Sequence, residues 1–215
     1  MTTAHEKLTK VLRALAALRD AEAAFLDKKD PFDQTEAIQT VLAKITGDTE
    51  VDFARRNEII FLLGKMKGRV SFSALLGLLA NPHPETRTAV GNTLIERANE
   101  DLDAFLVVVE ATIDGVKRAN THTRHDQICE ALPSILAEIG SKKVAVPCRR
   151  LLRHRNERVV FEAISALIYL GDKASLPDLT TLKQDERMVN IGSEDKPKFM
   201  TIGQLAKEAI DNIAS

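Results

Sequence analysis

The most prominent chemistry-bearing residues are basic side chains gathered in one interior segment. Residues 115–158 hold ten lysines and arginines against four acidic residues, although the whole chain is nearly neutral, with 30 basic and 31 acidic side chains. Arg149 and Arg153 are four residues apart, so a helix places them on one face. Such a face binds carboxylates or phosphates. The candidate partner-binding residues are Arg149, Arg150, Arg153 and Arg155, with Arg118 and Arg124 in support.

An acidic stretch precedes the basic segment and leaves two interpretations open. It runs from Glu96 to Asp114 and includes Asp101, Asp103 and Glu110. The opposite charges either attract each other within the protein or form a two-signed groove that binds a partner. An ordinary solvated helix face explains the basic residues equally well, because runs of charge are common on such faces.

A second set of residues contains the donor atoms that zinc prefers. His122, His125, Cys129 and Cys148 are its members, and a helix over residues 122–129 would place the first three on one face. The repeat pattern described below, however, aligns both cysteines with apolar core positions, where cysteine acts as a small hydrophobic residue. It also places both histidines in a loop. We therefore expect two buried thiols and no metal site.

Common catalytic and targeting motifs are missing from the sequence. No serine has a G-x-S-x-G context, and there is no Walker loop and no G-x-G-x-x-G. We expect a protein that is not an enzyme and needs no cofactor. Two cysteines are too few for a disulfide framework, and no apolar run approaches the roughly 18 residues of a membrane span. These features predict a soluble, reduced, cytoplasmic protein with no membrane partner.

The elements that must position these residues are helices. Hydrophobic residues make up 44% of the 215 residues but aromatic residues only 4%, with one tyrosine and no tryptophan. The apolar content is therefore mostly alanine, leucine, isoleucine and valine. Alanine and leucine are strong helix formers, so the composition predicts an all-α protein. The scarcity of aromatic residues also disfavours proteins that bind nucleic acids by stacking on bases.

A helical unit recurs along the chain. In residues 159–171, VVFEAISALIYLG, apolar side chains follow a helical period and Gly171 stands where a left-handed cap is expected. A second helix follows at 174–184. Related first helices occupy 53–64, 85–98, 128–140 and 201–213, and all but the last are followed by a second helix. The unit is 31–34 residues long, with insertions at 115–125 and 185–199.

These repeats predict one continuous array at 51–215, preceded by an N-terminal helical cap at 1–50. The apolar residues of the insertion at 185–199 predict that it folds back on the array or contacts a partner. Helix pairs of this kind cannot bury their apolar faces alone, and they form a core by stacking.

The repeats resemble HEAT repeats, particularly the short subtype named after phycobilisome lyases, which reads approximately D-P-x-V-R-x-x-A-x-x-A-L-x-x-L-G. The segment NPHPETRTAVGNTL carries Arg87 at the arginine position, and residues 159–171 carry Ala163, Ala166 and Leu167. The resemblance covers roughly residues 50–213. It implies an α-solenoid of antiparallel helix pairs whose second helices line a curved surface. Pro133, inside a predicted first helix, suits this family because kinked first helices are common in it.

The resemblance and the basic face together predict a non-enzymatic adaptor or scaffold that binds a protein, acidic or phosphorylated, through its curved surface. The alternative is a nucleic-acid-binding or DNA-processing HEAT-like protein that uses the same basic residues. A second alternative is a lyase- or chaperone-type subunit that handles a chromophore or a modified protein. Phosphate contacts would make binding steeply salt-dependent, whereas a protein partner with an apolar anchor would resist salt.

Overall fold

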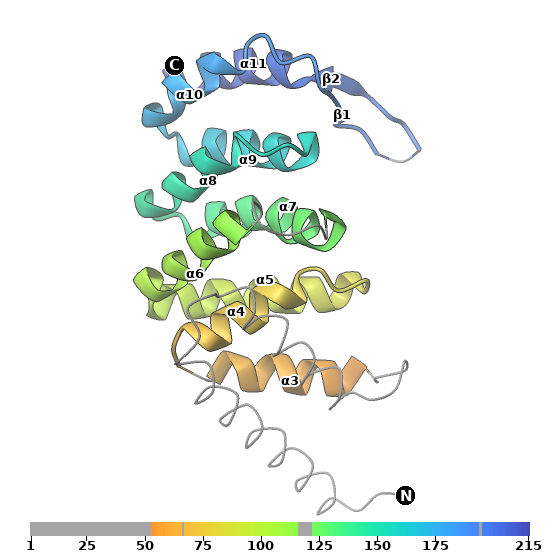
Figure 1. The fold of residues 1–215 in the computed structure, drawn as a ribbon, viewed down its shortest axis with the longest axis vertical. Coiled ribbons are helices and arrows are strands. Elements are labelled where there is room, and N and C mark those ends of the chain that lie inside the picture. The colour runs from red at the N-terminus through yellow and green to blue at the C-terminus, as the bar shows by residue number, and fades with distance from the viewer. Residues whose placement is uncertain (1–52, 66, 116–121, 194) are drawn as a thin grey trace, which may run out of the picture. The chain divides into compact units, whose positions relative to one another are not determined.

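The computed structural model describes residues 53–65, 67–115, 122–193 and 195–215. Most of these residues are helical, which confirms the all-α prediction at the level of fold class (Figure 1). The expected N-terminal cap at 1–50 and the candidate Arg118 lie outside the described residues. The chain forms two compact units, Met1–Thr93 and Leu94–Ser215, and each is described by itself.

In the first unit, helices α3 (Phe53–Lys65) and α4 (Arg69–Leu78) pack against each other, and α5 (Pro84–Glu100) begins near the end of the unit. Gly64 is predicted to end the first helix, but α3 continues through it. A Cβ at this position would stand 2.8 Å from Thr93 Cγ2, so Gly64 permits close packing rather than a left-handed cap. Arg87 holds the turn before α5, because its Nη1 donates to Asn81 O at 2.8 Å and to Pro82 O at 3.1 Å.

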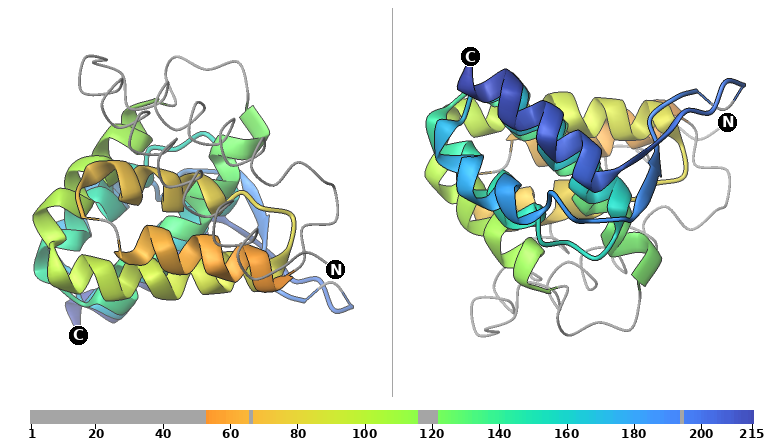
Figure 2. Two further views of the ribbon diagram at one scale, coloured as in Figure 1. Left: turned by 90° about the horizontal axis from the view of Figure 1, so that it is seen from below. Right: turned by 90° about the horizontal axis from the view of Figure 1, so that it is seen from above.

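Besides the end of α5, the second unit contains four longer helices and two shorter ones among its described residues. They are α6 (Leu102–Gly115), α7 (His122–Ile139), α8 (Ala145–Leu151), α9 (Glu157–Leu170), α10 (Leu176–Thr181) and α11 (Ile202–Ala214). Helix α9 packs between α7 and α11, while α8 packs against both α6 and α9. From above, in the right panel of Figure 2, α11 overlies α9. No helix among the described residues is long and apolar enough to cross a membrane.

Short 3-10 turns, η1 (Lys142–Val144) and η2 (Lys173–Ser175), lead into α8 and α10. A glycine follows the end of each helix that precedes these turns, α7 and α9. Gly140 has φ 70° and Gly171 has φ 60°, which confirms the predicted left-handed cap at Gly171. At the other end of α9, the side chain of Asn156 accepts a hydrogen bond from Arg158 N at 2.8 Å. These caps satisfy backbone groups that a helix end leaves without partners.

The insertion at 185–199 contains the β1 strand (Met188–Asn190), which pairs antiparallel with β2 (Phe199–Thr201). In β1, the side chain of Val189 is buried, and the strand contacts α9. The insertion therefore folds back on the helices, as expected. The sequence pattern does not predict these strands. Gly192 is required near the tip, because a Cβ there would stand 2.2 Å from Lys196 O.

Candidate functional site

The basic residues of α8 and the turn after it form ion pairs with the elements that follow. Arg149 Nη1 lies 3.3 Å from Asp172 Oδ2, in the turn after α9. Arg153 Nη2 lies 3.1 Å from Asp178 Oδ1, on α10. The Arg149 side chain is 25% exposed, whereas that of Arg153 is 82% exposed. Arg149 therefore belongs to the packing between elements, and Arg153 offers most of its surface to solvent.

Other basic residues of the same region pair with the acidic stretch that precedes them. Arg150 Nη2 contacts Asp114 Oδ1 at the end of α6, and Lys143 Nζ lies 2.8 Å from Asp103 Oδ1 at its start. The opposite charges of these two segments thus attract each other within the second unit. Such exposed pairs typically contribute up to about 1 kcal/mol each.

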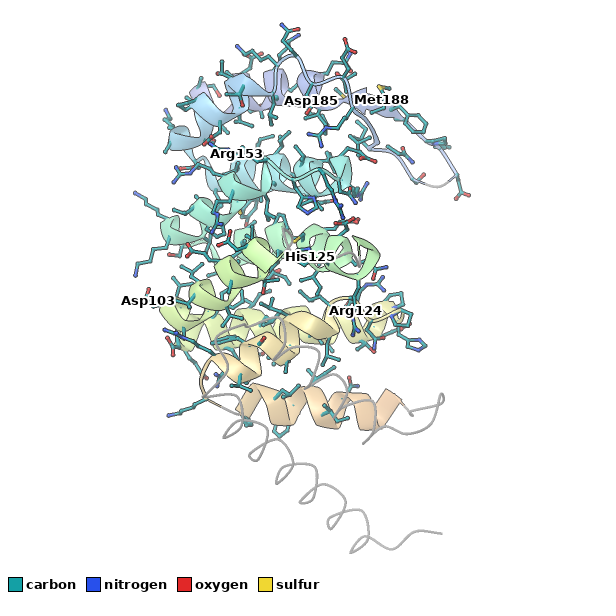
Figure 3. All side chains as sticks on the ribbon, viewed as in Figure 1. Asp103, Arg124, His125, Arg153, Asp185 and Met188 are labelled. Carbon is teal, nitrogen blue, oxygen red and sulfur yellow. The ribbon has the colours of Figure 1, made fainter. Side chains whose placement is uncertain are left out.

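The remaining candidates lie elsewhere. Arg155 Nη2 is 3.5 Å from Asp126 Oδ1 on α7. Arg124 is exposed in the first turn of α7 and lies well apart from Arg153 (Figure 3). The structure thus brings Arg149, Arg150 and Arg153 together at α8 and separates Arg124 from them.

Arg187 is a site residue that the sequence analysis does not single out. Its Nη1 donates to two carbonyl oxygens in the turn between α8 and α9, His154 O at 2.9 Å and Arg155 O at 2.8 Å. Its Nε and Nη2 bind the carboxylate of Asp185, with the shortest contact at 2.6 Å. The hydrogen bonds from Arg187 hold the pKa of Asp185 below its ordinary value. The close Asp-x-Arg spacing is a local signal for this pair, but nothing local indicates the carbonyl partners.

Arg158 links the hairpin to the helices in a similar way. Its Nε lies 3.2 Å from Glu130 Oε1 and its Nη2 lies 3.0 Å from Glu162 Oε1. Its Nη1 donates to Asn190 O, in β1, at 2.9 Å. Its guanidinium also stands 5.2 Å from the ring centre of Phe161. One side chain therefore joins α7, α9 and β1.

The histidine–cysteine set differs from the sequence expectation. His122 and His125 are not in a loop, because α7 begins at His122. His125 and Cys129 therefore stand one helical turn apart, and His125 Nδ1 lies 3.4 Å from Cys129 Sγ. The side chain of His122 lies outside the described part of the structure. His125 Nε2 is 2.8 Å from Thr112 O, and because a carbonyl only accepts, this nitrogen carries the proton and donates.

His154, which the sequence analysis does not include, joins this pair from the turn before α9. One ligand atom from each of His125, Cys129 and His154 lies within 4.8 Å of the other two. The side chain of His154 is 4% exposed. Its Nδ1 accepts from Asn156 N at 3.1 Å. Among the described residues, its Nε2 has no hydrogen-bond partner, and Asp126 Oδ1 stands 3.7 Å away. Figure 3 labels His125 in the interior of the unit.

Burial sets the protonation of this region. Both Cys129 and Cys148 are fully buried, which confirms the expectation that they occupy the core. Burial raises the pKa of Cys129 to about 12, with a further contribution from the charge of Asp126. It raises the pKa of Cys148 to about 12 as well, helped by Asp172. Burial lowers the pKa of His154, although the nearby Asp126 opposes this shift. Without a metal ion, the two thiols are neutral at neutral pH.

Comparison of the chain with models of known protein families finds no match. Comparison with curated proteins also finds no relative.

Proposed function

We propose that the chain is an α-solenoid of HEAT-like helix pairs that acts as a non-enzymatic adaptor and binds another protein. The packing of the second unit supports this. First helices α7, α9 and α11 pack in succession, and α8 packs against α6 and α9. The arginines of α8 and of the turn after it also form ion pairs with Asp114 on α6, with Asp172 after α9 and with Asp178 on α10. These ion pairs link α8 to the elements before and after it. Stacking of nearest neighbours is the architecture of repeat scaffolds.

The observation that carries the proposal is a pair of exposed apolar side chains on the hairpin. Met188 is 52% exposed and Phe199 is 58% exposed. The register pairs Met188 with Thr201 and Asn190 with Phe199, so Met188 and Phe199 share one face as diagonal neighbours. Val189 points to the opposite face and is buried. The buried Val189 thus holds the hairpin in place, with Met188 and Phe199 exposed on its other face. Large exposed apolar side chains in a fixed position are typical of the centre of a protein interface.

The charges favour a protein partner over nucleic acid. Arg149, Arg150 and Arg153 already pair with carboxylates, so a phosphate backbone would have to compete with these pairs. A protein partner would cover Met188 and Phe199 and place acidic or phosphorylated side chains near Arg153, the most exposed of the three arginines. Its affinity would then depend on salt only weakly, because apolar contacts are not screened.

The experiment compares the wild-type chain with a Met188→Ser, Phe199→Ser variant in affinity capture from lysate, followed by mass spectrometry. Tyr169→Ser is the matched control, because Tyr169 is 75% exposed but lies on α9 rather than the hairpin. We expect the hairpin variant to lose a protein that the control retains, with both variants keeping the helical content of the wild type. Direct binding is then measured with the purified partner at low and high salt.

The proposal fails if both variants retain the same proteins in the same amounts. It also fails if the purified chain binds DNA or RNA with a steep salt dependence that Arg153→Ala reduces, because that result indicates phosphate contacts.

A further inference from the structure

We propose that His125, Cys129 and His154 bind a single zinc ion, with the carboxylate of Asp126 as the fourth ligand. Three of these residues lie on α7, and His154 belongs to the turn between α8 and α9. The ion would thus join two consecutive helix pairs. This inference does not depend on the adaptor function.

Three of the four proposed donor atoms already lie close together. Zinc bonds of about 2.3 Å to sulfur and about 2.0 Å to nitrogen place neighbouring donors roughly 3.3 to 3.6 Å apart. The distance of 3.4 Å between Cys129 Sγ and His125 Nδ1 falls in this range. The three candidate ligand atoms lie within 4.8 Å of one another, so a contraction of about 1 Å brings these three to the separations that zinc requires. Small side-chain rotations would provide it.

The buried Nε2 of His154, which forms no hydrogen bond to any described residue, indicates that a ligand binds between these residues. Its side chain is almost fully buried, and its Nε2 has no hydrogen-bond partner in the described structure. A buried polar atom without a partner is costly and rare in folded proteins. A metal ion at Nε2 would satisfy this atom.

Zinc binding at Nε2 requires the ring proton to move to Nδ1. That nitrogen accepts from Asn156 N at 3.1 Å in the metal-free structure, so this contact must open. Loss of this hydrogen bond is outweighed by zinc binding. The net contribution of one hydrogen bond is small relative to the free energy with which zinc binds a complete site.

His125 is also oriented to bind the ion. Its Nε2 donates to Thr112 O at 2.8 Å, which leaves the lone pair of Nδ1 directed to the cluster. A backbone carbonyl on the second ring nitrogen is the usual support of a metal-binding histidine. Asp126 Oδ1 lies 3.7 Å from His154 Nε2, and binding to the ion would replace its ion pair with Arg155 Nη2, which lies 3.5 Å away. On binding, Cys129 releases its thiol proton to solvent, and the resulting thiolate and this carboxylate together balance the two charges of the ion.

The donor set and its burial indicate the kind of metal site. Thiolate and imidazole ligands suit zinc, whereas magnesium and calcium prefer oxygen ligands. His125, Cys129 and His154 are all buried, and Asp126, whose side chain is 19% exposed, would occupy the fourth position. A closed four-ligand site of this type is structural. We therefore assign the ion a stabilising role between α7 and the turn that precedes α9.

The test is a titration of the purified, chelator-treated full chain with Co²⁺, which reports ligand type by its absorption. We expect a thiolate-to-cobalt charge-transfer band with the visible bands of a tetrahedral site, saturating at one ion per chain and abolished by Zn²⁺. Cys129→Ser and His154→Gln should lower the affinity at least about 100-fold, more than the loss of a supporting contact does. Cys148→Ser is the matched control, because Cys148 is an equally buried thiol outside the cluster.

A second measurement avoids the risk that a variant fails to fold. X-ray absorption of the zinc-loaded wild type should show one sulfur and two imidazole ligands. The proposal is overturned if the wild type develops no thiolate-to-cobalt band, if Cys148→Ser removes the band while Cys129→Ser keeps it, or if the zinc shell contains no sulfur.

Discussion

Replacement of Arg187 by alanine should destabilise the protein more than replacement of an exposed arginine. The Arg187 side chain is 35% exposed and gives hydrogen bonds to His154 O, to Arg155 O and to the carboxylate of Asp185. It ties the segment before the hairpin to the turn between α8 and α9. Alanine leaves both carbonyl oxygens without this donor, whereas the carboxylate keeps the backbone N–H of residue 187, which donates to Asp185 Oδ1 at 3.0 Å.

The magnitude follows from the exposure of each lost bond. The bond to His154 O is partly buried, and a hydrogen bond to a charged group in such a place contributes about 1.5 kcal/mol or more. The bond to Arg155 O is exposed, so water replaces much of it, and the pair with Asp185 contributes about 0.5 to 1 kcal/mol. The freed side chain regains about 1 kcal/mol of rotamer entropy. We therefore expect a loss of about 2 kcal/mol, or roughly 30-fold in the folding equilibrium.

The assay is urea unfolding followed by circular dichroism, with Arg153→Ala as the control. Arg153 is 82% exposed and pairs with one carboxylate, so its loss should cost no more than about 1 kcal/mol. The reasoning is refuted if the two variants lose equal stability, or if Arg187→Ala unfolds at the same urea concentration as the wild type.

The pH dependence provides an independent check on the same contact. Arg187 holds the pKa of Asp185 below its unfolded value of 3.8, so the ionised carboxylate stabilises the fold above that pH. This stabilisation is lost as the pH falls through the lower, folded pKa. The difference in stability between the wild type and Asp185→Asn should therefore be full at pH 6 and vanish in strong acid, as measured by urea unfolding at each pH. A difference that grows on acidification would contradict this assignment.

Three further predictions concern local features of the second unit. Thr201→Ala removes the side-chain acceptor of the capping box that begins α11 and should cost about 1 kcal/mol of unfolding free energy, measured with urea. Gly203→Ala should cost about 1 to 3 kcal/mol in the same assay, because its Cβ would stand 2.7 Å from Lys183 O; an unchanged midpoint would disprove this close approach. In the metal-free protein, Cys129 and Cys148 should react with a thiol reagent at neutral pH only as fast as the protein unfolds, since both are buried with a pKa of about 12. Rapid labelling of either thiol in the folded protein would show that it is accessible.

The helices and many of their ends follow from the sequence alone. Helix α9 is read from the 3.6-residue period of its apolar residues, and Gly171 adopts the left-handed conformation that its position predicts. The burial of Cys129 and Cys148 follows from the same period. These features are local, since each depends on the order of a few neighbouring side chains and on the conformational freedom of glycine. The failure at Gly64 has a tertiary cause, because Thr93 occupies the space that a side chain would need.

The partners of the charged side chains and of the buried histidines and cysteine depend on tertiary structure. The basic segment suggests an open binding face, yet Arg149 and Arg150 meet carboxylates 23 and 36 residues away. His154 likewise joins Cys129 only because the turn before α9 packs on α7. Periodicity specifies which face of a helix is buried, but not which residues of the next helix lie opposite. Those contacts depend on the lengths of the turns and on how closely the small buried side chains let the helices approach, and only the folded chain determines both.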